Sequence, residues 1–266
     1  QAMLGADVEF ELEWVSVYQF ACRRIDRFRH GRVLFAGDAA HQVSPFGARG
    51  ANTGVQDIDN LVWKLALVQA GRADPALIDS YDEERAFAAD DNLRQSTRST
   101  DFITPKSATS RTLRDAVLEL AHDEPFARAL VNSGRLSTPT PYRHSSLNTP
   151  DVDPFAGRMS PGTNCADAPV QSADGRPGWL LNHLGRDFVL LSFGPAPCAE
   201  VRAGALQARV LTVGSDLIDS EGLLAERYDG RPGTVVLVRP DQHVAARWRR
   251  FDEQLIAAAL RRCTGH

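Results

Sequence analysis

The sequence has few cysteines and no arrangement that would pair them or use them to bind a metal. The four cysteines of the 266 residues lie far apart, and none belongs to a CxxC pair or to a Cys/His spacing suited to zinc. They are Cys22, Cys165, Cys198 and Cys263. We expect unpaired and mostly buried thiols and no metal site, which favours a reducing, cytoplasmic setting.

Long hydrophobic runs and an excess of charge are also absent. No apolar run approaches the roughly 18–20 residues that span a bilayer, and residues 1–15 lack the basic and apolar regions of a signal peptide. The formal net charge of -4 and the pI near 6.0 give no electrostatic reason to expect nucleic acid or a membrane surface as a partner. The composition is that of a soluble globular protein.

The two common phosphate-binding loops are missing as well. Neither GxGxxG after a strand nor GxxxxGK[ST] occurs in the chain. The Gly-rich loop that precedes a helix pattern reads Gly47-Ala48-Arg49-Gly50, which has the wrong spacing for both loops and contains no lysine. Any ligand of this loop is therefore recognised in another way.

The stretch GRVLFAGDAAHQVSPFGARGANTGVQDIDNLVWKL (31–65) predicts a strand, a Gly-rich loop and a helix. Residues 32–38 read as a strand buried on both faces, and apolar residues recur at helical spacing over 52–70. The free N–H groups and the dipole of the helix start favour negative charge. Asp38, at the strand end, can bind hydroxyls or cap a turn. Asp38 together with the Gly-rich loop and the helix start favours a ligand that has both hydroxyl groups and a delocalised anion, such as a reduced flavin.

This stretch closely resembles the second FAD-binding motif of the class A flavoprotein aromatic hydroxylases of the phenol and 3-(3-hydroxyphenyl)propionate hydroxylase type. The matching elements are GDAAH (37–41), PFGARGAN (45–52) and DIDNLVWKL (57–65). The resemblance is long and ungapped. It implies that FAD is the cofactor of this loop.

The resemblance also implies roles for individual residues. Asp38 would bind the ribityl hydroxyls, Pro45 would lie beside the flavin near its oxygen-reacting carbon, and Gly50, Ala51 and Asn52 would contact the isoalloxazine edge. It gives no catalytic residue and no metal ligand. The cofactor site expected from it comprises Gly37, Asp38, Pro45, Gly47, Gly50, Ala51 and Asn52.

Several neighbouring residues have two interpretations. Ser44 stands where this family commonly has Pro, and Arg49 stands where it commonly has Gln. Arg49 either places a cation near the flavin or is solvated, and we favour the second interpretation. His41 is a general base or, as we favour, a structural residue bonded to adjacent backbone. Trp63 is expected in the core, and Lys64 is expected to be solvated or salt-bridged.

The rest of the chain divides by composition. Residues 8–28 alternate as one or two strands, Asp74-Pro75 starts a long helix, and residues 110–133 form further helices broken near Pro125. Residues 134–177, rich in Pro, Ser and Thr, read as an extended linker. The remainder predicts a small α/β domain: strands at 188–193 and 208–214, helices at 199–207, 220–228 and 251–262, and a hairpin over 233–248.

In the family that this chain resembles, a thioredoxin-like domain ends the protein. Cys198 falls where a thioredoxin nucleophile would lie, but Val201 stands at the partner position. The expected fold class is α/β, with a partial FAD-binding domain followed by a thioredoxin-like domain without CxxC. The expected boundaries are 1–133 for the FAD-binding and substrate part, 134–177 for the linker and 178–266 for the C-terminal domain.

The resemblance implies an FAD-dependent monooxygenase that uses NAD(P)H and O2 to hydroxylate a phenolic ring through a flavin C4a-hydroperoxide. Because GxGxxG is absent, we expect a C-terminal fragment of such an enzyme, inactive by itself. One alternative is a non-catalytic binding module that homodimerises through its thioredoxin-like domain. Another is a redox protein that uses the Cys198 thiol.

Overall fold

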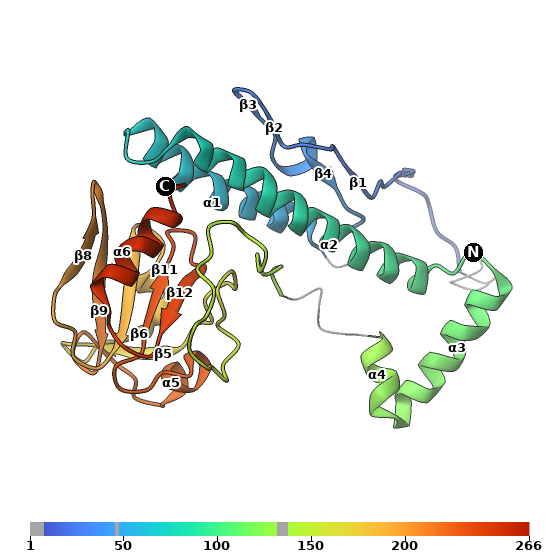
Figure 1. The fold of residues 1–266 in the computed structure, drawn as a ribbon. Coiled ribbons are helices and arrows are strands. Elements are labelled where there is room, and N and C mark those ends of the chain that lie inside the picture. The colour runs from blue at the N-terminus through green and yellow to red at the C-terminus, as the bar shows by residue number, and fades with distance from the viewer. Residues whose placement is uncertain (1–7, 46–47, 132–137, 266) are drawn as a thin grey trace.

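Two long helices form the middle of the chain and lie side by side (Figure 1). They are α1 (Gly50–Gln69) and α2 (Asp79–Ile103). The computed structural model describes residues 8–45, 48–131 and 138–265. A sheet-containing domain built from the C-terminal residues lies against one side of the helix pair (Figure 1).

The start of the chain forms little sheet. β1 (Arg23–Arg24) pairs with β4 (His41–Gln42), and β2 (Arg29–His30) pairs with β3 (Val33–Leu34). Residues 8–22 form no strand. The predictions of one or two strands over 8–28 and of a doubly buried strand over 32–38 are therefore wrong. A strand needs hydrogen-bonded neighbours and a covered face, and here Val33 is 55% exposed.

Helix α1 has a polar inner side and an apolar outer side. It begins two residues before the expected start and ends one residue before the expected end. Its outer residues Val55, Ile58 and Val62 are exposed. Its buried residues are Thr53, Asp57, Asn60, Leu61, Trp63 and Lys64. The inner side of α1 is thus held by polar contacts as much as by apolar packing.

The start of α2 follows the predicted capping pattern. The Asp74 carboxylate accepts a hydrogen bond of 2.7 Å from the Ala76 N–H, and Pro75 opens the 3-10 turn η2 (Pro75–Ile78) that leads into α2. Such a cap satisfies one of the free N–H groups of a helix start. The predicted helix start is confirmed.

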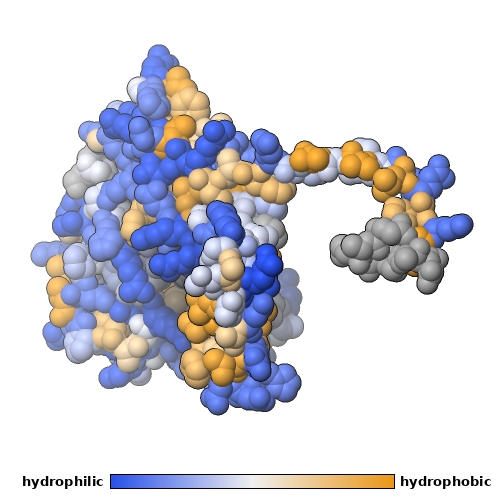
Figure 2. Space-filling model, turned by 90° about the vertical axis from the view of Figure 1, so that its right-hand side faces the viewer, coloured by the Kyte–Doolittle hydropathy of each residue, from blue (hydrophilic) through white to orange (hydrophobic). Residues whose placement is uncertain are grey.

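Two shorter helices extend away from the helix pair (Figure 1). They are α3 (Ala108–Asp123) and α4 (Pro125–Val131), and the break at Pro125 agrees with the prediction. Their side chains Leu113, Phe126 and Leu130 are exposed. Figure 2, which views the molecule from the side on which these helices lie, shows hydrophobic residues at the surface among hydrophilic ones. No helix in the described part of the chain has the length and apolar composition needed to cross a membrane.

The C-terminal domain is built on an eight-stranded sheet. Its strands are β5 (Pro169–Ser172), β6 (Pro177–Trp179), β7 (Phe188–Phe193), β8 (Glu200–Ala203), β9 (Leu206–Val213), β10 (Leu217–Ile218), β11 (Val235–Val238) and β12 (Val244–Trp248). The order is β12-β11-β7-β9-β10-β5-β6, and β8 pairs with β9. β7 and β9 are parallel, whereas β11 is antiparallel to β7 and β12. The predicted α/β class is confirmed, with α5 (Leu223–Tyr228) and α6 (Glu253–Arg262).

One predicted helix of this domain is wrong. Residues 199–207 form β8 and the first residues of β9, joined by a turn in which Gly204 has φ of +64°. Val201 and Ala203 are buried while Arg202 between them is exposed. This period of two is that of a strand. β5 and β6 also lie within or at the end of the predicted linker, whose boundaries stay a prediction.

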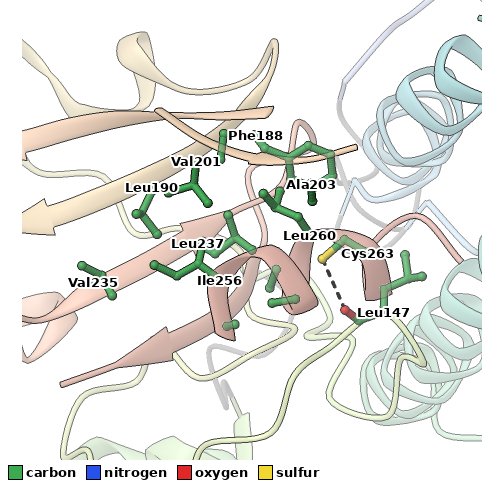
Figure 3. Packing of buried hydrophobic residues seen from close by; sticks show 14 of the residues in the cluster. Leu147, Phe188, Leu190, Val201, Ala203, Val235, Leu237, Ile256, Leu260 and Cys263 are labelled. Atoms are coloured by element: carbon green, nitrogen blue, oxygen red, sulfur yellow. Dashed lines mark hydrogen bonds between the residues drawn. The ribbon is translucent and has the colours of Figure 1, made fainter. Parts of the chain in front are cut away.

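The sheet carries an apolar core on each face. Alternate residues of β7 point to opposite sides, so Leu190 belongs to one core and Leu191 to the other. Figure 3 shows the first core, in which Leu237, Ile256 and Leu260 pack beside Leu190. Trp63 of α1 reaches this core and meets Phe188 edge to face at 5.7 Å between ring centroids. Trp63 is therefore a core residue, as predicted, and joins the helix pair to the sheet.

Candidate functional site

The predicted ligand loop lies where a short turn meets the start of α1. Gly37, Asp38 and Ala39 form the 3-10 turn η1 (Gly37–Ala39), which packs on α1. Gly37 has φ of +59°, and a Cβ placed on Gly54 of α1 would lie 3.3 Å from the Gly37 Cα. The two glycines allow a close approach of loop and helix that larger residues would obstruct.

The predicted cofactor residues lie around this junction. Gly37 and Ala51 line an open, mostly apolar groove of about 690 Å³ along α1. Asp38 is exposed and lines a neighbouring hollow of about 290 Å³ with residues of β1 and β4. Pro45 is exposed and accepts a hydrogen bond at its carbonyl from the Ala48 N–H. Gly47 lies outside the described residues.

Gly50, Ala51 and Asn52 form the first three positions of α1. The N–H groups at these positions have no partner within a helix, and the dipole of a 20-residue helix favours an anion there. The Asn52 side chain donates to the Ala48 carbonyl at 2.9 Å. The site therefore offers backbone donors at the start of α1 and, on the turn that packs against this helix, the exposed carboxylate of Asp38.

The expectation that Arg49 is solvated is wrong. Its side chain is only 7% exposed and donates to the Thr138 carbonyl at 2.8 Å. The chain around Thr138 packs on the Arg49 guanidinium and shields it from water. Arg49 thus joins the helix start to this segment.

His41 ends the loop and is buried. Its Nε2 lies 2.7 Å from Oδ2 of Asp57 on α1, and because an ionised carboxylate only accepts, His41 is the donor. The structural interpretation of His41 fits this contact, but its partner is a carboxylate across the junction, where adjacent backbone was expected. The loop is therefore held by a side chain sixteen residues further along the chain.

Asp57 makes three such contacts. It accepts from the Gly37 N–H at 2.9 Å, from His41, and from Nε of Arg85 at 2.6 Å. Burial opposes its ionisation, but the His41 hydrogen bond and the Arg85 charge outweigh it and hold the pKa of Asp57 below its usual value. Asp57 is thus an ionised, buried carboxylate behind the loop.

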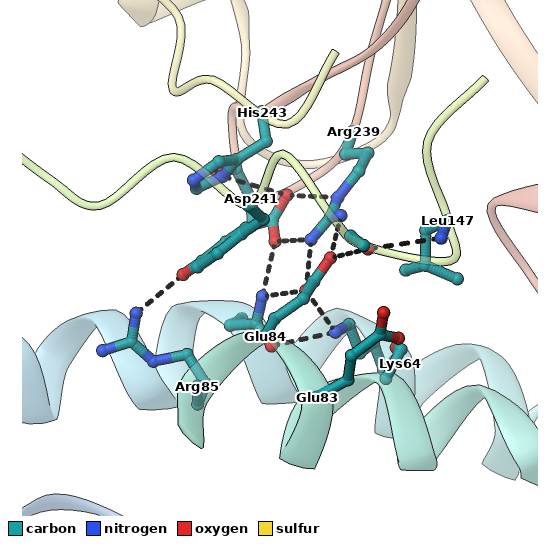
Figure 4. Close-up of polar contacts among 12 residues, drawn as sticks. Lys64, Glu83, Glu84, Arg85, Leu147, Arg239, Asp241 and His243 are labelled. Atoms are coloured by element: carbon teal, nitrogen blue, oxygen red, sulfur yellow. Dashed lines mark hydrogen bonds and ion pairs between the residues drawn. The ribbon is translucent and has the colours of Figure 1, made fainter. Parts of the chain in front are cut away.

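A second buried charge cluster lies between the helix pair and the sheet (Figure 4). Glu84 of α2 accepts from Lys64 of α1 at 2.7 Å and from Arg239 after β11 at 2.5 and 2.9 Å. Arg239 also donates to Asp241 at 2.5 and 3.0 Å. The Asn60 amide donates to both carboxylates, at 2.7 Å to Glu84 and 3.1 Å to Asp241. The four charged side chains are at most 1% exposed.

The charges in this cluster shift one another. Burial opposes the ionisation of Glu84, but Arg239 and Lys64 hold its pKa well below the usual range. Burial, only partly offset by Glu84, lowers the pKa of Lys64 to about 8. Of the two predicted states of Lys64, solvated or salt-bridged, the second is confirmed.

The sequence predicts the helix that carries Asp57 and Lys64, but it does not reveal their ionic partners. The spacing of Asp57, Asn60 and Lys64 at three and four residues puts them on one side of a helix. Glu84 and Arg85 are adjacent on α2, and this pair of opposite charges in the sequence is a local indication of ionic partners for α1. Arg239 is 155 residues from Glu84, so no local pattern could reveal that pair.

None of the four thiols is paired in this structure. The four cysteines are free, and Cys22 is exposed while Cys165 and Cys263 are buried. Burial, together with Glu253, raises the pKa of half-buried Cys198, which disfavours the thiolate that redox chemistry needs. Val201, at the position of a second cysteine, is buried in the sheet core. Within the described ranges no group of three His, Cys, Asp or Glu side chains could hold a metal ion.

Comparison with protein families gives two matches. Residues 2–96 match the FAD binding domain family, and residues 158–266 match the family described as aromatic-ring hydroxylase, C-terminal. The first match contains the loop, α1 and most of α2. The second contains the sheet.

Characterised relatives agree with both matches. The chain is 33% identical to 4-methyl-5-nitrocatechol 5-monooxygenase from Burkholderia sp over 97% of this chain and 48% of that protein. It is 30% identical to 3-(3-hydroxy-phenyl)propionate/3-hydroxycinnamic acid hydroxylase from Klebsiella pneumoniae subsp. pneumoniae over 86% of this chain and 45% of that protein. The chain thus spans about half the length of these relatives.

Solved structures share the fold. The ternary complex of aklavinone-11 hydroxylase with FAD and aklavinone is similar with a TM-score of 0.71 and 26% identity, over 94% of this chain and 46% of that chain. The flavin-dependent monooxygenase PieE, in complex with FAD and substrate, has the same fold with a TM-score of 0.70 at 24% identity, over 92% of this chain and 50% of that chain. Because residues 2–96 match the FAD binding domain family and residues 158–266 match the C-terminal family of aromatic-ring hydroxylases, the chain belongs to the family of FAD-dependent aromatic-ring hydroxylases.

Proposed function

We propose that this chain forms the part of an FAD-dependent aromatic-ring monooxygenase that holds the ribityl chain and the pyrimidine edge of the flavin. The observation that carries the proposal is the junction of η1 with α1. There an exposed carboxylate, Asp38, lies on a turn packed against a helix start with free backbone donors. The match of residues 2–96 to the FAD binding domain family supports it.

The residues present fit such a cofactor. Gly37 and Gly54 leave no side chain between the loop and α1, and a Cβ on Gly54 would crowd the loop backbone at 3.3 Å. The guanidinium of Arg49 is buried against Thr138. Pro45, Ala51 and Asn52 are exposed around the helix start.

Each group has a chemical task in this proposal. The Asp38 carboxylate accepts hydrogen bonds from ribityl hydroxyls, and the N–H groups of Gly50, Ala51 and Asn52 stabilise negative charge on the pyrimidine edge, as an oxyanion hole does. Gly37 keeps the backbone of the turn close to the cofactor, and Pro45 borders the flavin ring. When bound, FAD supplies electron transfer from NAD(P)H and the activation of O2.

The proposed substrate is a phenolic ring, into which one atom of O2 is inserted while the other leaves as water. The names of the nitrocatechol and hydroxyphenylpropionate relatives support this substrate class. NAD(P)H supplies the two electrons.

Because the chain lacks a GxGxxG loop for the ADP half of FAD, we propose that it is inactive without the remainder of such an enzyme. The proposal includes a cytoplasmic location and a homodimer formed through the C-terminal domain, which sedimentation of the intact protein would reveal.

Replacement of Asp38 tests the proposal. In the intact protein that carries this chain, Asp38→Ala should weaken FAD binding by about 1–3 kcal/mol, because ribityl hydroxyls lose a charged acceptor. FAD affinity is measured by flavin fluorescence, and NAD(P)H consumption is followed with a panel of phenols. Asp123→Ala, at an exposed helix end, is the matched control and should leave both unchanged. An intact protein that bound no FAD, or equal FAD affinity in both variants, would refute the proposal.

A further inference from the structure

The geometry points to Asp57 as the positioning residue of the flavin loop, by which we mean residues 37–41, and to Arg85 and Tyr142 as the side chains through which the C-terminal half of the chain acts on that loop. This inference rests on the proposed FAD site. It concerns residues that lie behind the loop, where they contact no cofactor.

The first step is that one carboxylate holds both ends of the loop. Oδ2 of Asp57 accepts from the Gly37 N–H at 2.9 Å and from His41 Nε2 at 2.7 Å. Asp38, the proposed ribityl ligand, lies between these two anchors and is itself exposed. The direction of the Asp38 carboxylate therefore depends on where Asp57 holds the turn.

The second step is that apolar packing cannot replace these bonds. Gly37 has no side chain, its φ of +59° is a conformation that other residues rarely adopt, and it faces Gly54 across the junction. The turn itself has a single backbone bond, from the Ala40 N–H to the Gly37 carbonyl at 2.9 Å. A glycine turn has many accessible conformations, so the carboxylate selects among them.

The third step is that Asp57 is itself held from the other half of the chain. Arg85 of α2 donates through Nε to Oδ1 of Asp57 at 2.6 Å and through Nη1 to the Tyr142 hydroxyl at 2.7 Å. The Tyr142 ring stacks on His243, with 4.5 Å between centroids and 21° between planes. Contacts therefore run without a gap from the hairpin of β11 and β12 to the Gly37 N–H.

The side chains in the middle of this chain of contacts are buried. Arg85 and Asp57 are at most 1% exposed, and Tyr142 is 3% exposed. In such surroundings a hydrogen bond to a charged group is stronger than in water, and an orphaned partner costs more. A change at Tyr142 is thus felt at Asp57.

Asp57→Asn is the decisive variant because it keeps the shape and removes the charge. An amide has one acceptor oxygen and a donor NH2 group, so it cannot accept from Arg85 on one side and from Gly37 and His41 on the other. In the intact protein we expect the FAD dissociation constant to rise about 10-fold to 100-fold, the range for a lost charge-assisted hydrogen bond. Asp79→Asn, on an exposed carboxylate of α2 paired with Arg29, is the matched control and should change it less than twofold.

A spectroscopic readout separates positioning from stability. At saturating FAD, the visible circular dichroism of the bound flavin should change in Asp57→Asn, since a displaced loop alters its surroundings. If Asp57 only stabilised the fold, the denaturation midpoint would fall while this spectrum stayed that of the wild type. That outcome would overturn the inference.

Tyr142→Phe keeps the test decisive if Asp57→Asn does not fold. It removes one hydroxyl and leaves the ring on His243. Because Tyr142 acts on the loop only through Arg85 and Asp57, we expect a smaller rise than in Asp57→Asn, of about 3-fold to 10-fold in the FAD dissociation constant. An unchanged constant in folded Tyr142→Phe would overturn the inference. If the wild type itself bound no FAD, the proposed function would fail with it; wild-type binding with unaffected variants would remove only the positioning role.

Discussion

The C-terminal sheet domain and the N-terminal region up to residue 131 are held together by different kinds of contact. The sheet has an apolar core on each face, and its central strand β7 is buried at every residue. Among its described residues, the N-terminal region has one small apolar cluster, around Phe28 and Tyr81, while Trp14, Val15 and Val17 are more than 60% exposed. Its interior is formed largely by hydrogen-bonded charges, among them Asp57, Glu84 and Arg85.

This difference shows where each region obtains its order. When a side chain in an apolar core is shortened, the loss in the free energy of unfolding increases with the volume of the cavity that is left. A buried ionic cluster is less tolerant, because removing one ion leaves another without its partner in a dry environment. The region that carries the proposed flavin loop is therefore the one most sensitive to single charges.

Removal of Arg239 should have the largest effect, since this residue joins the two regions. Arg239→Met leaves Glu84 and Asp241 buried without the guanidinium that pairs with both, and we expect a loss of about 3–5 kcal/mol in the free energy of unfolding. Urea denaturation measures it. Arg176→Met, which removes an exposed pair with Asp174, should cost less than about 0.5 kcal/mol. Equal midpoints for the two variants would contradict the ionic junction.

Truncation of a sheet residue should come next. Leu237 is fully buried in β11, so Leu237→Ala should lower the free energy of unfolding by about 2–4 kcal/mol through lost burial and a cavity. Leu113→Ala, at a leucine of α3 that is 66% exposed, is the control and should change it by less than about 0.5 kcal/mol. A larger loss at Leu113 would show that α3 has a partner beyond the described contacts.

Acid should weaken the ionic region before the sheet. Glu84 and Asp241 have pKa values held below the usual 4.5 and 3.8 by Arg239 and by Lys64 or His243, against the opposing effect of burial. The unfolded chain then binds more protons below about pH 4.5, so stability falls on acidification by up to about 1.4 kcal/mol per pH unit for each proton. Denaturation midpoints between pH 3 and 7 measure the slope. Glu84→Gln should flatten it, and an unchanged slope would assign the acid sensitivity to other carboxylates.

The smallest expected effects are at helix caps, one in each region. Asp252 accepts from the Leu255 N–H at 3.0 Å and Ser107 from the Ser110 N–H at 3.1 Å. Alanine at either cap should cost about 1 kcal/mol of local helix stability. In Asp252→Ala this should lower the global midpoint because α6 packs on the sheet core. In Ser107→Ala it should appear only as faster amide exchange in exposed α3. A global loss in Ser107→Ala would remove the distinction between the regions.

The sequence predicts the fold well wherever local patterns match a local partner. The helix over 52–70, the Asp74 cap and the hairpin over 233–248 depend on neighbours nearby in the chain. The strand at 188–193 is a continuous apolar run, and every residue of it is buried. The strands expected over 8–28 and 32–38 require distant partners that a pattern cannot supply. The apolar residues of 199–207 fit helical spacing, but Val201 and Ala203 are buried on either side of exposed Arg202, which is the alternation of a strand.

The candidate site is predictable in part. The motif gave the loop and helix start, and these lie together at η1 and α1. It did not give the carboxylate of Asp57 as the anchor of Gly37, nor Arg85 and Tyr142 behind it. Such contacts join residues that are distant in the sequence, so their ion pairs and hydrogen bonds become visible only in three dimensions.

The pair of Glu84 and Arg239 has a consequence for recombination between relatives. A chimera that exchanged only the C-terminal half would combine an α2 helix from one protein with a hairpin from another, and a carboxylate could meet no guanidinium. Each half would be intact, yet the hybrid would contain a buried uncompensated ion. Residues 84 and 239 must therefore be transferred as one unit, and a crossover point is better judged by the ion pairs it separates than by the linker it cuts.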